Sequence, residues 1–241
     1  MDRALSGRRW RCGYPGTAYL SGGFILTTPI LSVRSAEAID RAASLMEVGE
    51  IIVVPTDTVY GLATVMRGEA AIKRLYAVRG GRREPALPFF IDSIDRMAEL
   101  TRPNVTALRL AKRFWPGALT LILPPAASLP AHARAYPIAV RIAAYPPLAP
   151  LLEALGGYFL ITGAVRSGYP PAITAEEAAI FFEEGIALIL DGGPPPYGVP
   201  STIVDCVADP PLLIRRGAVP EDKIWQALGQ ERAPESAPGA P

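Results

Sequence analysis

The chain has 241 residues, half of them hydrophobic, with 24 basic and 23 acidic side chains, which suits one domain with a sizeable core. The net charge of +1 excludes a long-range field that would attract nucleic acid, and no apolar run reaches the roughly 18 residues of a membrane-spanning helix. Cys12 and Cys206 are too few for a disulfide framework and, with the single His132, predict no structural zinc site, so a reducing cytoplasm is the expected setting.

The first 34 residues form a basic segment that differs from the rest of the chain. Five arginines occur there against a single acid, Asp2. A transit peptide has this composition, and so does a disordered extension or one created by an upstream start codon. We therefore interpret residues 1–34 as an N-terminal extension outside the folded domain.

Helical and strand patterns begin directly after this segment. Ser35 is a good N-cap for a helix with apolar residues at helical spacing, and Gly49 ends it. The β-branched run Ile51 to Val54 predicts a buried strand. Further along, the patterns predict a helix over Glu69 to Val78, a strand over Pro88 to Ile91 and a helix from the cap Asn104 to Phe114.

The second half of the chain alternates short β-branched runs with helical segments. The predicted strands are Leu119 to Leu123, Ile138 to Ile142, Phe159 to Thr162, Ala187 to Leu190, Ser201 to Val204 and Leu212 to Ile214. Thr174 and Glu177 form a capping box before a helix through Glu184, and Pro220 begins a final helix. This alternation predicts one α/β domain over residues 35–229. Residues 230–241, rich in Pro, Ala and Glu, are expected to form a disordered tail.

A series of ordered motifs begins in the loop after the first predicted strand. Pro55 to Leu62 reads PTDTVYGL, which closely resembles the opening signature of the YrdC-like domain. The later matching segments are Phe114 to Thr120, Ala139 to Arg141, Ser167-Gly168 with Pro170 to Ala172, Asp191 to Gly193 with Gly198 and Ser201-Thr202, and Ile214 to Gly217. Because these runs follow the family's order, residues 36–228 resemble the threonylcarbamoyl-adenylate synthases, in the short form without an extra C-terminal domain.

The resemblance implies a YrdC/RibB-like fold, in which a twisted mixed sheet and flanking helices surround a deep cationic cavity. Members of the family form threonylcarbamoyl-AMP from L-threonine, bicarbonate and ATP, with Mg²⁺ on the ATP, and release pyrophosphate. The product serves the threonylcarbamoylation of adenosine in tRNA, so the implied partners are tRNA and the machinery that transfers the threonylcarbamoyl group. Such a reaction depends mainly on positioning and on cationic stabilisation of phosphate charge.

Three residues are implied to bind threonine by their place in the matching motifs: Thr58, Arg141 and Ser201. Arg141 ends an apolar strand, where a charge requires a partner, and a guanidinium suits a carboxylate in bidentate geometry. Thr58 has an alternative role as a turn residue that satisfies backbone donors. Tyr60, in the same motif, is expected to pack beneath the cavity wall.

The nucleotide is implied to contact Arg79, Arg82, Thr120, Ala164 and Arg215, with Arg79 and Arg82 as the catalytic cations. Thr120 also fits an ordinary strand position, because β-branched residues are common in strands. Arg215 has a surface salt bridge as its alternative. We expect the protein itself to supply no metal ligands.

Two segments depart from the family's usual residues. Arg79 stands where lysine is usual and Gly81 where arginine is usual, and Gly163 and Val165 replace a hydroxyl and an amide. Each lost polar contact to a charged ligand costs roughly 1.5–3 kcal/mol. We therefore predict that the protein binds ATP and threonine but turns over more slowly than a chain with the usual residues.

A second interpretation is a divergent, non-catalytic or repurposed YrdC-like paralogue that binds nucleotide or double-stranded RNA. A basic cluster favours it, because lysine and arginine neutralise phosphates, although a solvated helix end would look the same. The cluster comprises Lys73, Arg74, Arg79, Arg82 and Arg83. A component of a larger enzyme of carbamoyl chemistry is a third interpretation.

Overall fold

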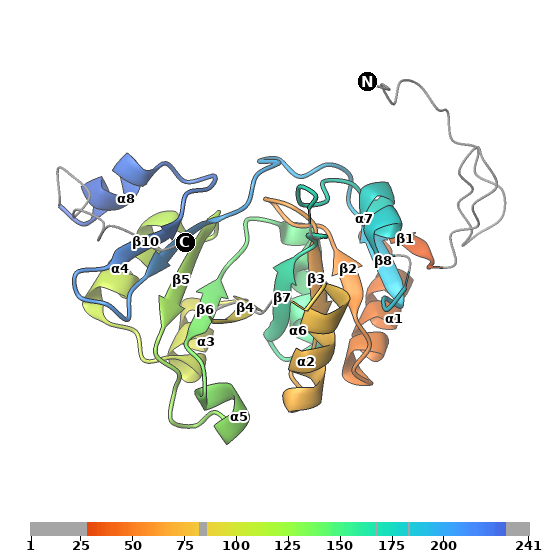
Figure 1. Cartoon of the computed structure of the whole chain (residues 1–241), viewed down its shortest axis with the longest axis horizontal. Helices are drawn as coiled ribbons and strands as arrows, with labels where there is room; N and C mark the ends of the chain where they lie inside the picture. The colour runs from red at the N-terminus through yellow and green to blue at the C-terminus, as the bar shows by residue number, and fades with distance from the viewer. Residues whose placement is uncertain (1–27, 82–85, 167, 183, 230–241) are drawn as a thin grey trace.

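A ten-stranded mixed sheet runs through the computed structural model of the chain, which describes residues 28–81, 86–166, 168–182 and 184–229. The strand order is β1-β8-β2-β3-β7-β4-β6-β5-β9-β10, and Figure 1 shows the strands crossing the molecule from β10 on the left to β1 on the right. Their bounds are β1 Ile30–Ser32, β2 Ile52–Val54, β3 Gly61–Thr64, β4 Leu87–Ile91, β5 Leu119–Leu123, β6 Ile138–Arg141, β7 Tyr158–Gly163, β8 Leu188–Asp191, β9 Thr202–Asp205 and β10 Leu212–Arg215.

Helices flank the sheet, and two clusters of buried side chains lie between them and the strands. The helices are α1 Ala36–Glu47, α2 Glu69–Val78, α3 Ile94–Leu100, α4 Val105–Phe114, α5 Ala131–Arg134, the 3-10 helix η1 Pro146–Leu148, α6 Ala149–Ala154, α7 Ala175–Phe181 and α8 Glu221–Ala227. α1 and α6 contribute to one cluster, and α2, α3, α4, α7 and α8 to the other. Within the described ranges, no helix is long and apolar enough to cross a membrane.

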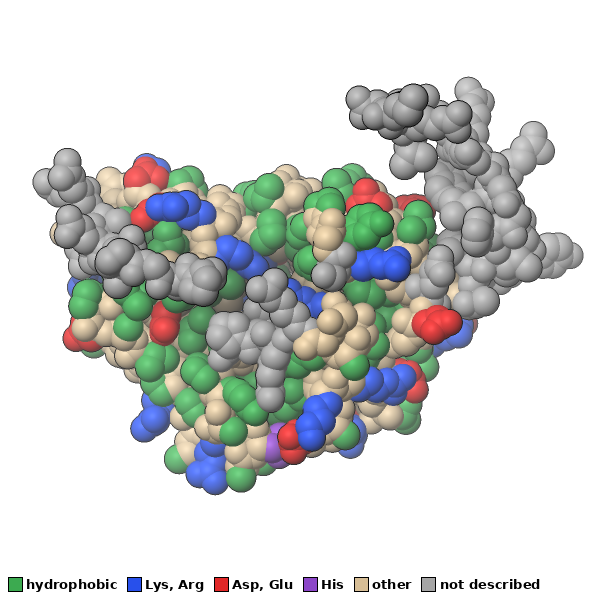
Figure 2. Space-filling view, viewed as in Figure 1, with side chains coloured by type: hydrophobic (Ala, Val, Ile, Leu, Met, Phe, Trp, Pro, Cys, Tyr) green, Lys and Arg blue, Asp and Glu red, His purple; other side chains and the backbone are tan. Residues whose placement is uncertain are grey.

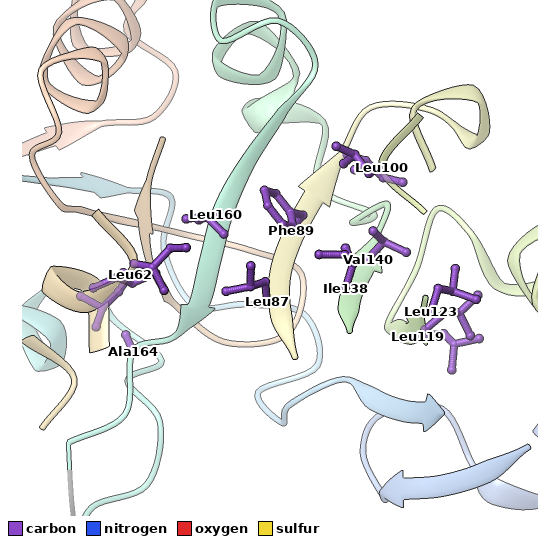
Figure 3. Packing of buried hydrophobic residues seen from close by; sticks show 14 of the residues in the cluster. Leu62, Leu87, Phe89, Leu100, Leu119, Leu123, Ile138, Val140, Leu160 and Ala164 are labelled. Atoms are coloured by element: carbon purple, nitrogen blue, oxygen red, sulfur yellow. The ribbon is translucent and has the colours of Figure 1, made fainter. Parts of the chain in front are cut away.

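Alternation along the central strands explains why both clusters form. Ile51 and Val53 belong to the larger cluster, whereas Ile52 and Val54 belong to the other, because successive side chains of a strand point to opposite faces. Figure 3 shows side chains of the larger cluster packed along neighbouring strands, with Phe89 on β4 between β7 and β6. The sheet is therefore covered on both sides, which confirms the predicted α/β class.

Side-chain caps fix the starts of three helices at the predicted residues. Ser35 Oγ accepts from the backbone of Ala38, Asn104 Oδ1 accepts from Ala107 N at 2.8 Å, and Thr174 Oγ1 accepts from Glu177 N at 3.1 Å. Each bond satisfies a backbone donor that the first helical turn leaves without a partner. These helix starts are confirmed, but α7 ends at Phe181 rather than at Glu184.

The predicted boundary of the N-terminal extension at residue 34 is wrong. Ile30–Ser32 forms β1, which pairs in parallel with β8 at one edge of the sheet. The backbone of Val33 then donates to Asp191 O at 2.8 Å, which extends the contact. The folded part therefore includes at least residues 30–34, while residues 1–27 and the predicted tail 230–241 lie outside the described residues.

Candidate functional site

A cavity of about 310 Å³ lies against the middle of the sheet and brings the predicted site residues together. Strands β3 to β7, β9 and β10 contribute to its lining, together with the loops that follow β2 and precede β9. Six predicted residues border it, namely Thr58, Arg79, Thr120, Arg141, Ser201 and Arg215. Figure 2 shows basic side chains near the centre of one face of the molecule. The predicted convergence of distant motifs on one cavity is therefore confirmed.

Arg141, at the end of β6, is held in place by three acceptors. It is 4% exposed, its Nε donates to Gly117 O at 2.8 Å, and its Nη1 donates to Thr58 Oγ1 at 2.9 Å. Its Nη2 donates to the carboxylate of Asp57 in a buried ion pair. Burial lowers the pKa of Arg141, whereas the charge of Asp57 acts in the opposite direction. The expected partner of this buried charge thus lies within the protein.

Asp57 is the functional residue that the sequence interpretation missed. It lies in the opening motif directly before Thr58 and is 1% exposed. The available signal was an acid three residues after the apolar strand that ends at Val54 and a base at the end of another apolar strand, since a buried charge of either sign requires a partner. Their separation in sequence gave no indication that the two would meet.

The loop 55–59 presents Thr58 to the cavity through a local hydrogen-bond network. Thr56 Oγ1 accepts from Thr58 N at 3.0 Å and donates to Val59 O at 2.6 Å. The Thr58 hydroxyl lies 3.1 Å from Thr56 Oγ1 and accepts from Arg141. Thr58 therefore has the local bonding of a turn residue, and it also lines the cavity.

A second polar group joins β5, β9 and β10. Thr120 Oγ1 and Ser201 Oγ are 2.8 Å apart, and Arg215 Nη2 donates to Ser201 Oγ at 3.1 Å. Arg215 Nε also donates to Ser201 O at 3.0 Å, which fixes the guanidinium above the start of β9. The network places two hydroxyls and a cation on the same wall of the cavity.

Tyr60 is fully buried and joins the opening motif to the loop after β8. Its hydroxyl donates to Gly193 O at 2.9 Å, lies 3.2 Å from Asp191 Oδ1, and accepts from Gly192 N at 3.3 Å. Burial raises the pKa of Tyr60, so the phenol is protonated at neutral pH. Tyr60 packs in the larger core cluster as expected, but it also belongs to the lining of the cavity.

Ala164, which is predicted to contact the nucleotide, does not line the cavity. Its side chain is fully buried in the larger core cluster, where Figure 3 places it beside Leu62. Its backbone N–H donates to Tyr60 O at 2.8 Å, and its carbonyl accepts from Ala172 N at 2.9 Å. Its neighbours Gly163 and Val165 line the cavity instead. Arg82 lies outside the described residues.

The departures from the family's usual residues have different structural settings. Gly163 and Val165 border the cavity, so a hydroxyl and an amide there would face a ligand. Gly81 has φ of +79°, in the left-handed region that favours glycine. An arginine would therefore be strained at this position, whereas Arg79 lines the cavity.

The basic cluster is partly neutralised by one acid of α2 itself and one acid that precedes β2. Lys73 pairs with Glu69 at 3.0 Å along α2, and Arg74 pairs with Glu50 at 2.5 Å. These pairs reduce the positive charge that the helix could present to phosphates. Arg82 and Arg83 lie outside the described residues, so the cluster as predicted is not established.

A family model and several known proteins match most of the chain. The family model for Sua5, YciO and YrdC, described as telomere recombination, matches residues 44–217. The chain is 36% identical over 210 residues to the threonylcarbamoyl-AMP synthase of Bacillus subtilis, which covers 86% of this chain and 60% of that protein. It is 32% identical over 184 residues to the threonylcarbamoyl-AMP synthase of Chromohalobacter salexigens, which covers 71% of this chain and 94% of that protein.

Solved structures resemble the chain over most of its length. Sua5 of Pyrococcus abyssi in complex with L-threonine has a TM-score of 0.77 at 34% identity, covering 85% of this chain and 62% of that chain. YciO of Escherichia coli has a TM-score of 0.73 at 25% identity, covering 82% of this chain and 99% of that chain. The chain thus spans about 60% of the length of the Bacillus and Pyrococcus relatives and nearly the whole of YciO.

Proposed function

Because the chain belongs to the family of Sua5, YciO and YrdC proteins, we propose that it is a threonylcarbamoyl-AMP synthase that uses L-threonine, bicarbonate and ATP. The observation that carries the proposal is the convergence of distant motif residues on one cavity. Thr58, Arg141 and Ser201 are suited to an amino acid, and Arg79 and Arg215 are suited to phosphates. Relatives that carry this name, and a relative in complex with L-threonine, support it.

The proposed reaction needs the carbamate of threonine and ATP to be held in line with each other. Bicarbonate and the threonine amine form a carbamate with loss of water, and a carbamate oxygen then attacks the α-phosphorus of ATP. A phosphorus–oxygen bond forms, the bond from the α-phosphorus to the bridging oxygen breaks, and pyrophosphate leaves. Mg²⁺ would enter with ATP as part of the substrate, because it is usually bound through the substrate phosphates with only one or two carboxylates.

Arg141 has the donors that a carboxylate requires. A guanidinium carries five N–H groups. Within the described part of the chain, Asp57, Thr58 and Gly117 accept one each, which leaves two for a substrate carboxylate. Two donors suffice for bidentate recognition. Threonine would thus lie with its carboxylate against Arg141 and its polar atoms within reach of the hydroxyls of Thr58 and Ser201.

Other residues of the cavity lining suit the nucleotide. Arg215 and Arg79 provide positive charge for the phosphates, with Arg82 as a further predicted cation. Ile203 pairs with Thr120 and Arg215 across the sheet and, with Ile122, offers apolar surface for adenine. The product would then pass, in the cytoplasm, to the machinery that transfers the threonylcarbamoyl group to tRNA. The ion pairs of Lys73 and Arg74 favour this function over double-stranded RNA binding.

Pyrophosphate release tests the proposal. The purified chain is incubated with ATP, Mg²⁺, bicarbonate and threonine, and pyrophosphate is measured with and without threonine. We expect release that requires both threonine and bicarbonate, at a lower rate than that of the Chromohalobacter relative. Release that is independent of threonine, or no release together with no ATP binding, would exclude the synthase function.

A further inference from the structure

Asp57 contacts Arg141 without itself lining the cavity. Its carboxylate accepts from Arg141 and, at 3.2 Å, from the backbone N–H of Ala144. Its carbonyl accepts from Tyr197 N at 3.0 Å. Asp57 is therefore fixed by the loops after β6 and β8 as well as by its own loop. It contacts the guanidinium from a position outside the cavity lining.

The pair of Arg141 and Asp57 is electrically neutral at the threonine end of the cavity. The other groups that contact the guanidinium are the carbonyl of Gly117, the hydroxyl of Thr58 and the ring of Phe90, whose centroid lies 5.4 Å from the guanidinium carbon. None of these three is charged. Both members of the pair are buried, so removal of one charge leaves the other uncompensated away from water.

We propose that Asp57 is a positioning residue that limits the affinity of Arg141 for the substrate carboxylate. The proposal rests on the synthase function, in which threonine is the ligand. Because Asp57 already neutralises the guanidinium, the two remaining N–H donors recognise threonine. The substrate carboxylate does not have to neutralise an unpaired buried cation. A carboxylate that binds a neutral pocket less tightly also dissociates more readily. This applies to the product as well as to threonine, because the product retains the carboxylate of threonine. Asp57 thereby limits a binding energy that substrate and product share equally and that therefore does not favour the reaction.

The substitution Asp57→Asn removes the negative charge of the side chain and keeps its shape. Asparagine keeps one acceptor for Arg141 but leaves its positive charge uncompensated. We expect the melting temperature without ligand to fall and the dissociation constant for threonine to decrease about tenfold, which corresponds to about 1.4 kcal/mol. The rise in melting temperature on addition of threonine should become larger. The KM for threonine should fall while the KM for ATP stays unchanged.

Two controls make the result specific. L-threoninol has a hydroxymethyl group in place of the carboxylate, so its affinity should not increase in Asp57→Asn. Glu50→Gln removes the acid of the pair with Arg74, whose side chain is 43% exposed, and should change neither affinity nor the threonine-induced shift. Isothermal titration calorimetry and thermal melts with both ligands provide the measurements.

Each outcome decides the proposal. Threonine binding by Asp57→Asn that is unchanged or weaker than that of the unchanged protein would contradict it and leave Asp57 with a structural role. A variant that folds only when threonine is present would support it, whereas one that threonine does not rescue would contradict it. The double variant Asp57→Asn/Arg141→Gln lacks both charges and should regain stability without the gain in affinity. If the unchanged protein binds no threonine, the synthase function fails instead.

Discussion

The side-chain hydroxyls of Thr120 and Ser201 lie 2.8 Å apart, so a residue assigned to the nucleotide and a residue assigned to threonine contact each other directly. Thr120 belongs to β5, Ser201 directly precedes β9, and these two strands pair in parallel. Arg215 adds a hydrogen bond of 3.1 Å to the same Ser201 oxygen. The two ends of the proposed site therefore share one hydrogen-bond network.

The substitution Ser201→Ala should weaken the binding of both substrates. It removes the shared hydroxyl, which contacts both Thr120 and the charged group of Arg215. Bonds to charged groups contribute about 1.5–3 kcal/mol, so we expect both KM values to rise about tenfold or more. Ser128→Ala, at a residue whose hydroxyl donates a 3.4 Å bond on the surface, is the matched control. A change in only one KM would show that the two ends are independent.

Truncation of Arg141 should affect threonine far more than ATP. Arg141→Ala removes the two donors available to the carboxylate and leaves Asp57 buried without its cation. We expect a loss of about 2–5 kcal/mol in threonine binding, measured by calorimetry, and a lower melting temperature. Arg141→Lys keeps the charge but loses the planar donors, so its loss should be intermediate. An equal loss for both ligands would contradict the assigned role.

Removal of the Tyr60 hydroxyl should destabilise the fold. In Tyr60→Phe the half-buried Gly192 N–H and Gly193 carbonyl lose a partner, and we expect a loss of about 1–3 kcal/mol in urea unfolding. Tyr169→Phe, at a side chain that is 55% exposed, should cost much less. Equal losses in the two variants would show that the hydrogen bonds of the Tyr60 hydroxyl contribute nothing.

Tyr60 also predicts a specific response to alkaline pH. Burial raises the pKa of its phenol above the usual value of about 10, so the unfolded chain ionises at a pH where the folded chain does not. The unfolded state then binds fewer protons, and stability should fall as the pH rises above about 10. The fall should be smaller in Tyr60→Phe; an identical pH dependence in both proteins would contradict this assignment.

Restoring two polar groups at the cavity should raise turnover. A side chain built at Gly163 would meet Val165 Cγ2 at 3.4 Å, an ordinary contact, so serine fits there. We expect the double variant Gly163→Ser/Val165→Asn to release pyrophosphate faster than the unchanged protein. Gly81→Arg is the contrasting variant, because the left-handed backbone there should make it destabilising. Unchanged turnover in the double variant would show that Gly163 and Val165 do not limit the reaction.

Much of the fold could be predicted because local signals agreed with the tertiary structure. α2 and β5 have the predicted bounds, and the caps Ser35 and Asn104 begin their helices as expected. β3 was missed because Gly61–Thr64 has no clear alternation, and its strand character depends on pairing with β2 and β7. β1 was missed for the same reason, since three residues acquire a role only beside β8.

The sequence could predict which residues line the candidate site, but not which contacts they make with one another. The motif resemblance located Thr58, Arg141 and Ser201, which line one cavity. It could not indicate the ion pair of Arg141 with Asp57, because that contact depends on how β6 and the opening loop approach each other. Nor could it indicate that the backbone of Ala164 is occupied by Tyr60 and Ala172.

Detection of the product tests the proposed synthase function most directly. The chain is incubated with ATP, Mg²⁺, threonine and ¹³C-labelled bicarbonate, and the nucleotides are analysed by mass spectrometry. We predict a product with the mass of threonylcarbamoyl-AMP that carries the label, in equal amount to pyrophosphate and only when threonine is present. The absence of a labelled product from both the unchanged protein and the Gly163→Ser/Val165→Asn variant would contradict the assignment of this cavity to threonylcarbamoyl-AMP synthesis.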